Sequence, residues 1–126
     1  MPQILVLEPY PALRQALAML LQRAEWHVTA VPTTRATRQA LAQDAHDVVL
    51  VDLDNAGSAG WNILRALQDR PTPVSLVALL SPDSRSWPDA GAQGPLALVP
   101  TPVRREVLLT AVREALTSAQ HRQEHA

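Results

Sequence analysis

The chain has 126 residues, 47% of them hydrophobic and 18% charged, which is enough apolar material for the core of one domain. Its formal net charge of -1 argues against binding to nucleic acid or to anionic membrane surfaces. It has no cysteine, and all 11 of its basic residues are arginine, so disulfide bonds, thiolate metal sites and lysine chemistry are excluded. No segment has the pattern of a secretion leader or a membrane span, so we expect a cytoplasmic protein.

The first half of the chain predicts two strand–helix units. Residues 3–7 are almost entirely apolar and predict a short buried strand, and Pro11 suits the first turn of the helix that follows. The apolar side chains of this helix repeat at helical spacing: Leu13, Leu17, Leu20, Leu21 and Ala24. Residues 26–31 predict a second strand, and Thr33 or Thr34 can cap the next helix. The apolar face of that helix is weak and consists of Ala36, Ala40 and Leu41.

The second half predicts three further strands with helices between them. Residues 47–51 are apolar on both alternating faces, as in a central parallel strand covered by helices on both sides. The remaining strands are predicted at 74–80 and 96–99, and the remaining helices at 61–69 and from about 104 to 119. Prolines and glycines between 81 and 94 leave room only for a short helix there. We interpret residues 1–120 as one domain and 121–126 as a polar C-terminal tail.

This alternation of strands and helices predicts an α/β fold with a three-layer, doubly wound parallel sheet. The ligand site of such a sheet lies beyond the carboxyl ends of its strands. Glu8, Asp52 and Ser81 each come directly after a predicted strand. Their side chains should therefore converge on one pocket.

Three features of the sequence now coincide with a known family. Asp52 ends the predicted third strand, Gly60 lies eight residues later, and residues 101–108 read TPVRREVL at the start of the last helix. These features resemble the receiver domain of bacterial two-component response regulators (CheY-like), over nearly the whole chain. The resemblance implies a flavodoxin-like, five-stranded sheet of order 2-1-3-4-5 with a shortened or irregular fourth helix. It also implies phosphorelay signal transduction, in which a histidine kinase or phosphotransfer protein phosphorylates Asp52 and the chain itself is not an enzyme.

The resemblance assigns the other site residues, with two departures from the family pattern. The family has two adjacent acids after its first strand, which fall here on Glu8 and Pro9, and a lysine that falls on Thr101. Its hydroxyl residue after the fourth strand matches Ser81, which together with Thr101 would contact the phosphoryl group and transmit the change. Pro9 has no side-chain oxygen and the chain has no lysine, so Mg²⁺ binding and phosphoryl transfer should both be weaker than in the family.

Asp54 suggests how this chain could compensate for the missing acid. It lies two residues beyond Asp52, at the position whose backbone carbonyl ligates the metal in the family. We expect Glu8, Asp52 and Asp54 to form a weakened and unconventional Mg²⁺ site, because Mg²⁺ prefers oxygen ligands. The alternative is that Asp54 belongs to an ordinary turn with the sequence Asp-Asn-Ala-Gly.

Two functions follow from these residues. The first is a phosphorelay receiver, and the second is a pseudo-receiver that acts as a phosphorylation-independent protein-interaction module, which Pro9, Thr101 and the broken fourth helix favour. In either case the output would pass to another protein, or to a second copy of the chain, through the face of the fourth helix, the fifth strand and the last helix.

Other functional classes find less support in the sequence. The stretch DLDNA at 52–56 approximates the motif of haloacid-dehalogenase-type phosphatases, but that family carries it on the first strand and needs further lysine motifs. Dinucleotide binding would need a glycine fingerprint, and flavin binding a hydroxyl-rich loop after the first strand; both are absent.

Overall fold

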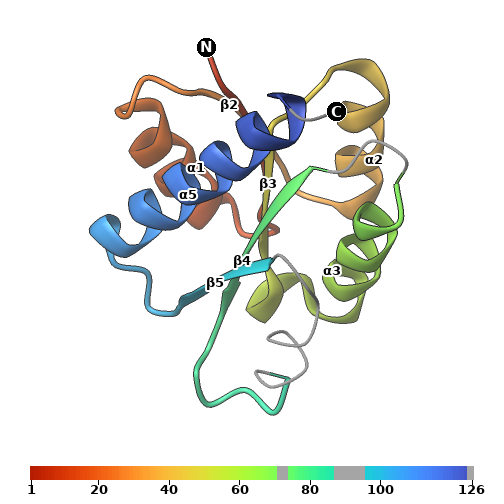
Figure 1. Ribbon diagram of the computed structural model, residues 1–126. Helices are drawn as coiled ribbons and strands as arrows, with labels where there is room; N and C mark the ends of the chain where they lie inside the picture. The colour runs from red at the N-terminus through yellow and green to blue at the C-terminus, as the bar shows by residue number, and fades with distance from the viewer. Residues whose placement is uncertain (71–73, 87–95, 125–126) are drawn as a thin grey trace.

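The computed structural model describes residues 1–70, 74–86 and 96–124. Five parallel strands form one sheet in the order β2-β1-β3-β4-β5, which confirms the predicted flavodoxin-like topology. The strands are β1 (Gln3–Leu7), β2 (His27–Val31), β3 (Val48–Asp52), β4 (Ser75–Leu80) and β5 (Leu96–Pro100). The helices are α1 (Pro11–Gln22), α2 (Thr34–Gln43), α3 (Leu53–Gln68) and α5 (Arg105–Glu124). Figure 1 shows the sheet between two helical layers, with α1 and α5 on one face and α2 and α3 on the other.

The three central strands are the most apolar part of the chain and are buried on both faces. In β1 and β3 every position from Ile4 to Leu7 and from Val48 to Val51 is essentially inaccessible, as the unbroken apolar runs predict. In the parallel register Leu7 pairs with Val51, and Asp52 pairs with Leu79. The strand ends are therefore aligned, and the residues that follow β1, β3 and β4 meet at one edge of the sheet.

Helix α1 confirms the sequence prediction at its start but not along its whole length. Pro11 occupies the first turn, and Leu17 and Leu21 are buried against the sheet. Leu13, which belongs to the same predicted stripe, is 43% exposed, and Ala24 lies beyond the end of the helix. Helical spacing identifies the side chains that share a face, but it does not say how far along the helix that face is covered.

Helix α2 is anchored by two threonines. The Thr33 hydroxyl accepts a hydrogen bond from the Ala36 N–H at 3.0 Å, which confirms Thr33 as the cap. The completely buried residue of this helix is Thr37, whose hydroxyl donates to the Thr33 carbonyl at 2.9 Å. Burial of a hydroxyl group is tolerated here because the helix itself supplies the acceptor.

Helix α3 begins eight residues earlier than the sequence predicts, at Leu53 rather than at 61. Asp52 caps it, and the small residues that suggest a loop are helical, apart from a break at Gly57, where φ is +58°. Gly60 is buried, and a Cβ atom there would lie 2.8 Å from the Ala56 Cβ. Glycine is therefore required at Gly57 by backbone conformation and at Gly60 by close packing.

The C-terminal third differs from the prediction mainly in the length of α5. This helix continues to Glu124, so the predicted polar tail at 121–126 begins inside it. Residues 81–86 contain turns, and the predicted fourth helix falls largely on 87–95, outside the described residues. The Thr101–Pro102 peptide bond is cis. None of the helices in the described ranges is long and apolar enough to cross a membrane.

Candidate functional site

All five residues singled out in the sequence lie at the carboxyl-terminal edge of the sheet. Glu8 follows β1, Asp52 ends β3 and Asp54 lies in the first turn of α3. Ser81 follows β4 and Thr101 follows β5. β2 and β3 lie on opposite sides of β1, so the strand order reverses between β1 and β3, where ligand sites form in such sheets.

Glu8 and Asp52 form a buried acid pair held by Asn55. Glu8 is 0% exposed and Asp52 only 3% exposed. The Asn55 side-chain amide donates to Oδ2 of Asp52 at 2.6 Å and to Oε2 of Glu8 at 3.4 Å, and its backbone N–H donates to Oδ1 of Asp52 at 3.4 Å. Asn55 was not among the residues predicted from the sequence. The sequence signal that could have identified Asn55 is its position three residues after Asp52, because the third residue of a helix commonly interacts with the capping residue.

The protonation state of Glu8 follows from its surroundings. Burial raises the pKa of its carboxyl from the ordinary value of 4.5 to about 8, with further increases from a hydrogen bond to Asp52 and from the Asp52 charge. The Tyr10 N–H and the Asn55 amide oppose this by lowering the pKa. At neutral pH Glu8 therefore carries a proton, which it can share with the Asp52 carboxylate. As an ionised group Glu8 would leave its Oε1 buried, without a partner among the described residues.

The loop after β1 is held in place by the side chain of Arg14. Arg14 donates from its guanidinium group to the backbone carbonyls of Glu8 at 3.0 Å and of Pro9 at 3.3 Å. The Glu8 N–H donates to the Val31 carbonyl at 3.0 Å. The backbone of Glu8 is therefore held by α1 through its carbonyl and by β2 through its N–H.

Asp54 joins Ser81 and Thr101 instead of the acid pair. Its Oδ1 accepts a hydrogen bond from the Ser81 N–H at 3.0 Å, and its Oδ2 accepts one from the Thr101 hydroxyl at 2.7 Å. In the described part of the chain no three histidine or acidic side chains are arranged to hold a metal ion. The predicted residues thus fall into two groups, a buried pair of Glu8 and Asp52 and an exposed cluster around Asp54.

Comparison with solved structures identifies the fold. The chain resembles a signal receiver domain of an HD domain-containing protein from Pseudomonas fluorescens Pf-5 (24% identity, TM-score 0.82, 95% of this chain and 98% of that chain covered). It also resembles the chemotaxis response regulator CheY4 of Vibrio cholerae (19% identity, TM-score 0.80, 92% and 99% covered). A third similar structure is the signal receiver domain of a signal transduction histidine kinase from Syntrophus aciditrophicus (20% identity, TM-score 0.82, 94% and 92% covered).

These matches define the fold of the domain. The chain has the fold of CheY-like response-regulator receiver domains, in agreement with the resemblance in its sequence. No family model and no curated protein matches the sequence. The fold is therefore recognisable in three dimensions even though the sequence matches no family model.

Proposed function

We propose that this chain is a receiver-fold signalling module that works by binding other proteins and does not depend on a phosphoryl group at Asp52. The observation that carries this proposal is the position of Asn55, which donates hydrogen bonds to both oxygens of Asp52. Asp52 is also almost completely buried. A phosphodonor would have to displace Asn55 before it could reach the Asp52 carboxylate.

The charge balance of the site supports the same proposal. A phosphoryl group would add negative charge beside two carboxyl groups, and such charge is normally neutralised by a divalent cation and a fixed ammonium group. The chain has no lysine, and Pro9 supplies no side-chain oxygen. Arg14, whose guanidinium group reaches this loop from α1, is hydrogen-bonded to backbone carbonyls.

A second candidate function is phosphorylation of Asp52 by a histidine kinase or phosphotransfer protein, and one observation favours it. Oε1 of Glu8 is buried with no partner in the described ranges, and a bound cation would supply one. Glu8 and Asp52 are the residues that would hold Mg²⁺, and bound Mg²⁺ would neutralise charge on the phosphoryl group. In the transfer itself an Asp52 oxygen would bond to phosphorus while the bond from phosphorus to the donor breaks and its electrons leave with the donor.

Intact mass after incubation with acetyl phosphate and Mg²⁺ tests the two candidates directly. We expect no phosphoryl adduct on the wild-type protein. An adduct on the wild type that is absent from Asp52→Asn would overturn the first function and establish the second. Asn55→Ala is the informative companion, because an adduct on this variant alone would show that Asn55 is what keeps donors from Asp52.

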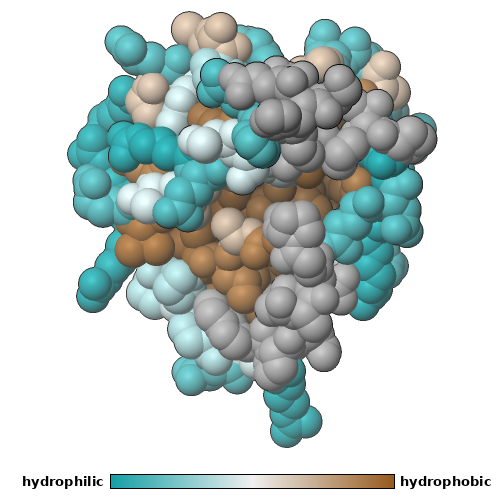
Figure 2. All heavy atoms as spheres, viewed as in Figure 1, coloured by the Kyte–Doolittle hydropathy of each residue, from teal (hydrophilic) through white to brown (hydrophobic). Residues whose placement is uncertain are grey.

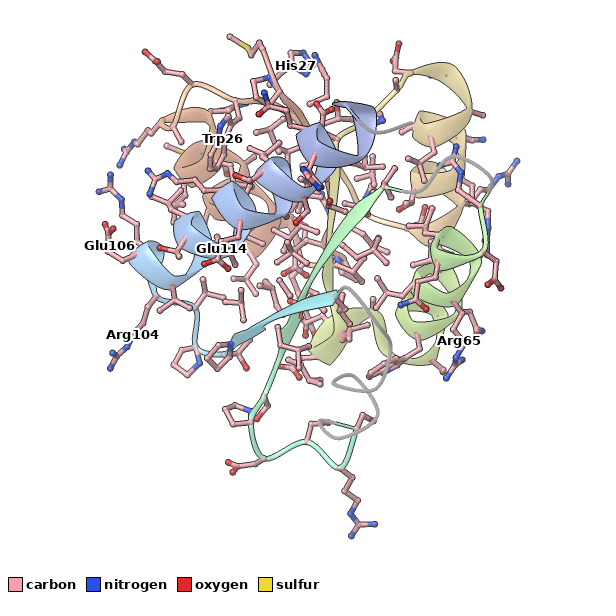
Figure 3. All side chains as sticks on the ribbon, in the orientation of Figure 1. Trp26, His27, Arg65, Arg104, Glu106 and Glu114 are labelled. Carbon is pink, nitrogen blue, oxygen red and sulfur yellow. The ribbon has the colours of Figure 1, made fainter. Side chains whose placement is uncertain are left out.

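The surface proposed to bind a partner is a groove between β5 and α5. It is open to solvent, has a volume of about 500 Å³ and is lined by Ala97, Leu98, Glu106, Val107, Thr110, Ala111 and Glu114. Val107 is 39% exposed, and Figure 2 shows apolar atoms exposed in the middle of this face. Figure 3 shows both glutamates projecting from α5, and neither has an ion pair within the described residues.

The chemistry of this groove specifies the kind of partner. Among the described strands β5 has a neighbour on one side only, β4, and an edge strand of this kind can pair with an added strand. Glu106 and Glu114, which form no ion pair within the described residues, favour basic side chains, and the apolar lining favours apolar ones. We therefore propose an extended partner segment that combines basic and apolar residues.

A further inference from the structure

The carboxylate of Asp54 connects the start of α3 to two loops that are distant in the sequence. Asp54 lies in the first turn of α3, directly after β3. Its two oxygens accept separate hydrogen bonds from the Ser81 N–H after β4, at 3.0 Å, and from the Thr101 hydroxyl after β5, at 2.7 Å. One side chain thus ties together the ends of three adjacent strands.

The donors around Asp54 are of the kind that hold an oxyanion. A backbone N–H and a hydroxyl group each donate one hydrogen bond, and an ionised carboxylate accepts them through different oxygens. Hydrogen bonds to a charged acceptor are shorter and stronger than neutral ones. No cation contacts Asp54 among the described residues, so its partners are the two neutral donors, the Ser81 N–H and the Thr101 hydroxyl.

We propose that Asp54 is a built-in anionic ligand that positions the loops after β4 and β5, so that the β5–α5 groove keeps one shape without a phosphoryl group. This inference rests on the proposed function. It identifies the hydrogen bonds of Asp54 as the contact that keeps the groove in one conformation. The connection to the groove is short, because α5 begins at Arg105, four residues after Thr101. Glu106 and Val107, which line the groove, lie in the first turn of that helix.

Asp52 and Asp54 have separate roles in this arrangement. Asp52 caps α3 and faces Asn55 and Glu8. By starting the helix at Leu53, the cap places Asp54 in the first turn, where its carboxylate reaches the loops after β4 and β5. Asp54 is thus a positioning residue for the groove, and its two hydrogen bonds involve neither member of the acid pair.

Amide hydrogen exchange followed by NMR reports on this contact at the Ser81 N–H itself. Asp54→Ala removes both acceptors, and we expect the Ser81 amide to exchange roughly tenfold faster, as loss of one charge-assisted hydrogen bond predicts. Thr101→Val removes the other donor with little change in shape and should also accelerate exchange at Ser81. The double variant should exchange no faster than Asp54→Ala, because both substitutions break the same connection.

Two further variants separate this contact from a general loss of charge or stability. Asp83→Asn removes a carboxylate from the loop after β4 and should leave exchange at Ser81 unchanged. Asp54→Asn keeps one acceptor oxygen and should have an intermediate effect, which remains measurable if Asp54→Ala does not fold. Wild-type exchange rates at Ser81 in both Asp54 variants, or additive effects in the double variant, would overturn the inference.

The same spectra test the consequence for the groove. Chemical shifts of Ala97, Leu98, Val107 and Ala111 should move in Asp54→Ala and stay close to their wild-type values in Asp52→Asn. The opposite pattern would show that the acid pair, and not Asp54, controls the groove. A phosphoryl adduct on the wild-type protein would refute the proposed function without altering these results, so the two failures can be told apart.

Discussion

Asn55 donates to both carboxylate oxygens of Asp52, at 2.6 Å from its side-chain amide and at 3.4 Å from its backbone N–H. A single residue therefore satisfies the carboxylate that a receiver would have to leave free for a phosphodonor. The same amide reaches Oε2 of Glu8, so it contacts both acids. Asp52 and Asn55 together form the start of α3.

We expect Asn55→Ala to destabilise the protein by about 1–3 kcal/mol, because it leaves a buried oxygen of Asp52 without its donor. The free energy of unfolding from urea titrations would measure this. Asn62→Ala is a matched control in α3, since Asn62 is exposed and its side-chain oxygen accepts a hydrogen bond from the Arg65 guanidinium. Equal effects of the two substitutions would contradict the role assigned to Asn55.

The raised pKa of Glu8 predicts how stability depends on pH. Between 4.5, its ordinary value, and about 8, the folded protein holds a proton on Glu8 that the unfolded chain has released. Unfolding then releases a proton, so this group stabilises the fold at low pH and loses that contribution as the pH rises toward 8.

Glu8→Gln removes this dependence while keeping the shape of the side chain. The variant should match the wild type near pH 5 and be more stable by about 2–4 kcal/mol near pH 8. Urea unfolding across this range, with EDTA present, gives the comparison. Glu114→Gln on the exposed surface of α5 is the control, and parallel pH profiles for wild type and Glu8→Gln would show that Glu8 ionises normally.

Gly60→Ala tests the close packing at the start of the second part of α3. The added Cβ would lie 2.8 Å from the Ala56 Cβ and 3.2–3.3 Å from side-chain atoms of Leu53 and Val51. We expect a loss of about 1–3 kcal/mol in unfolding free energy, the range for overpacking a buried position. Ser58→Ala, at an exposed position of the same helix, should change stability by less than about 0.5 kcal/mol.

The charge of the β5–α5 groove predicts the sequences that it selects. Peptides selected from a random display library against the wild-type protein should combine basic and apolar residues. Their affinity should fall roughly tenfold or more in a Glu106→Gln, Glu114→Gln double variant, as expected when two partner cations lose their counter-ions. Selected peptides that lack basic residues, or that bind the variant equally well, would argue against this surface.

The local pattern of the chain was enough to predict most of its architecture. The apolar runs at β1, β3 and β4 can be buried only by covering both faces, which requires parallel strands with helices on each side. Pro11 and Thr33 predict two helix starts through local geometry alone. The alignment of the parallel strands then brings Glu8, Asp52 and Ser81 to one edge, as predicted.

The chemistry of that edge depends on contacts between residues that are distant in the sequence. Asp54 meets Thr101 across 47 positions, and Asn55 reaches Glu8 across the same separation, so no local pattern could pair them. Burial likewise decides that Glu8 is protonated and that Leu13 is not part of the core. The order of strands and helices follows from propensity and periodicity, which are local, whereas the partner of each carboxylate follows from the packing of the whole sheet.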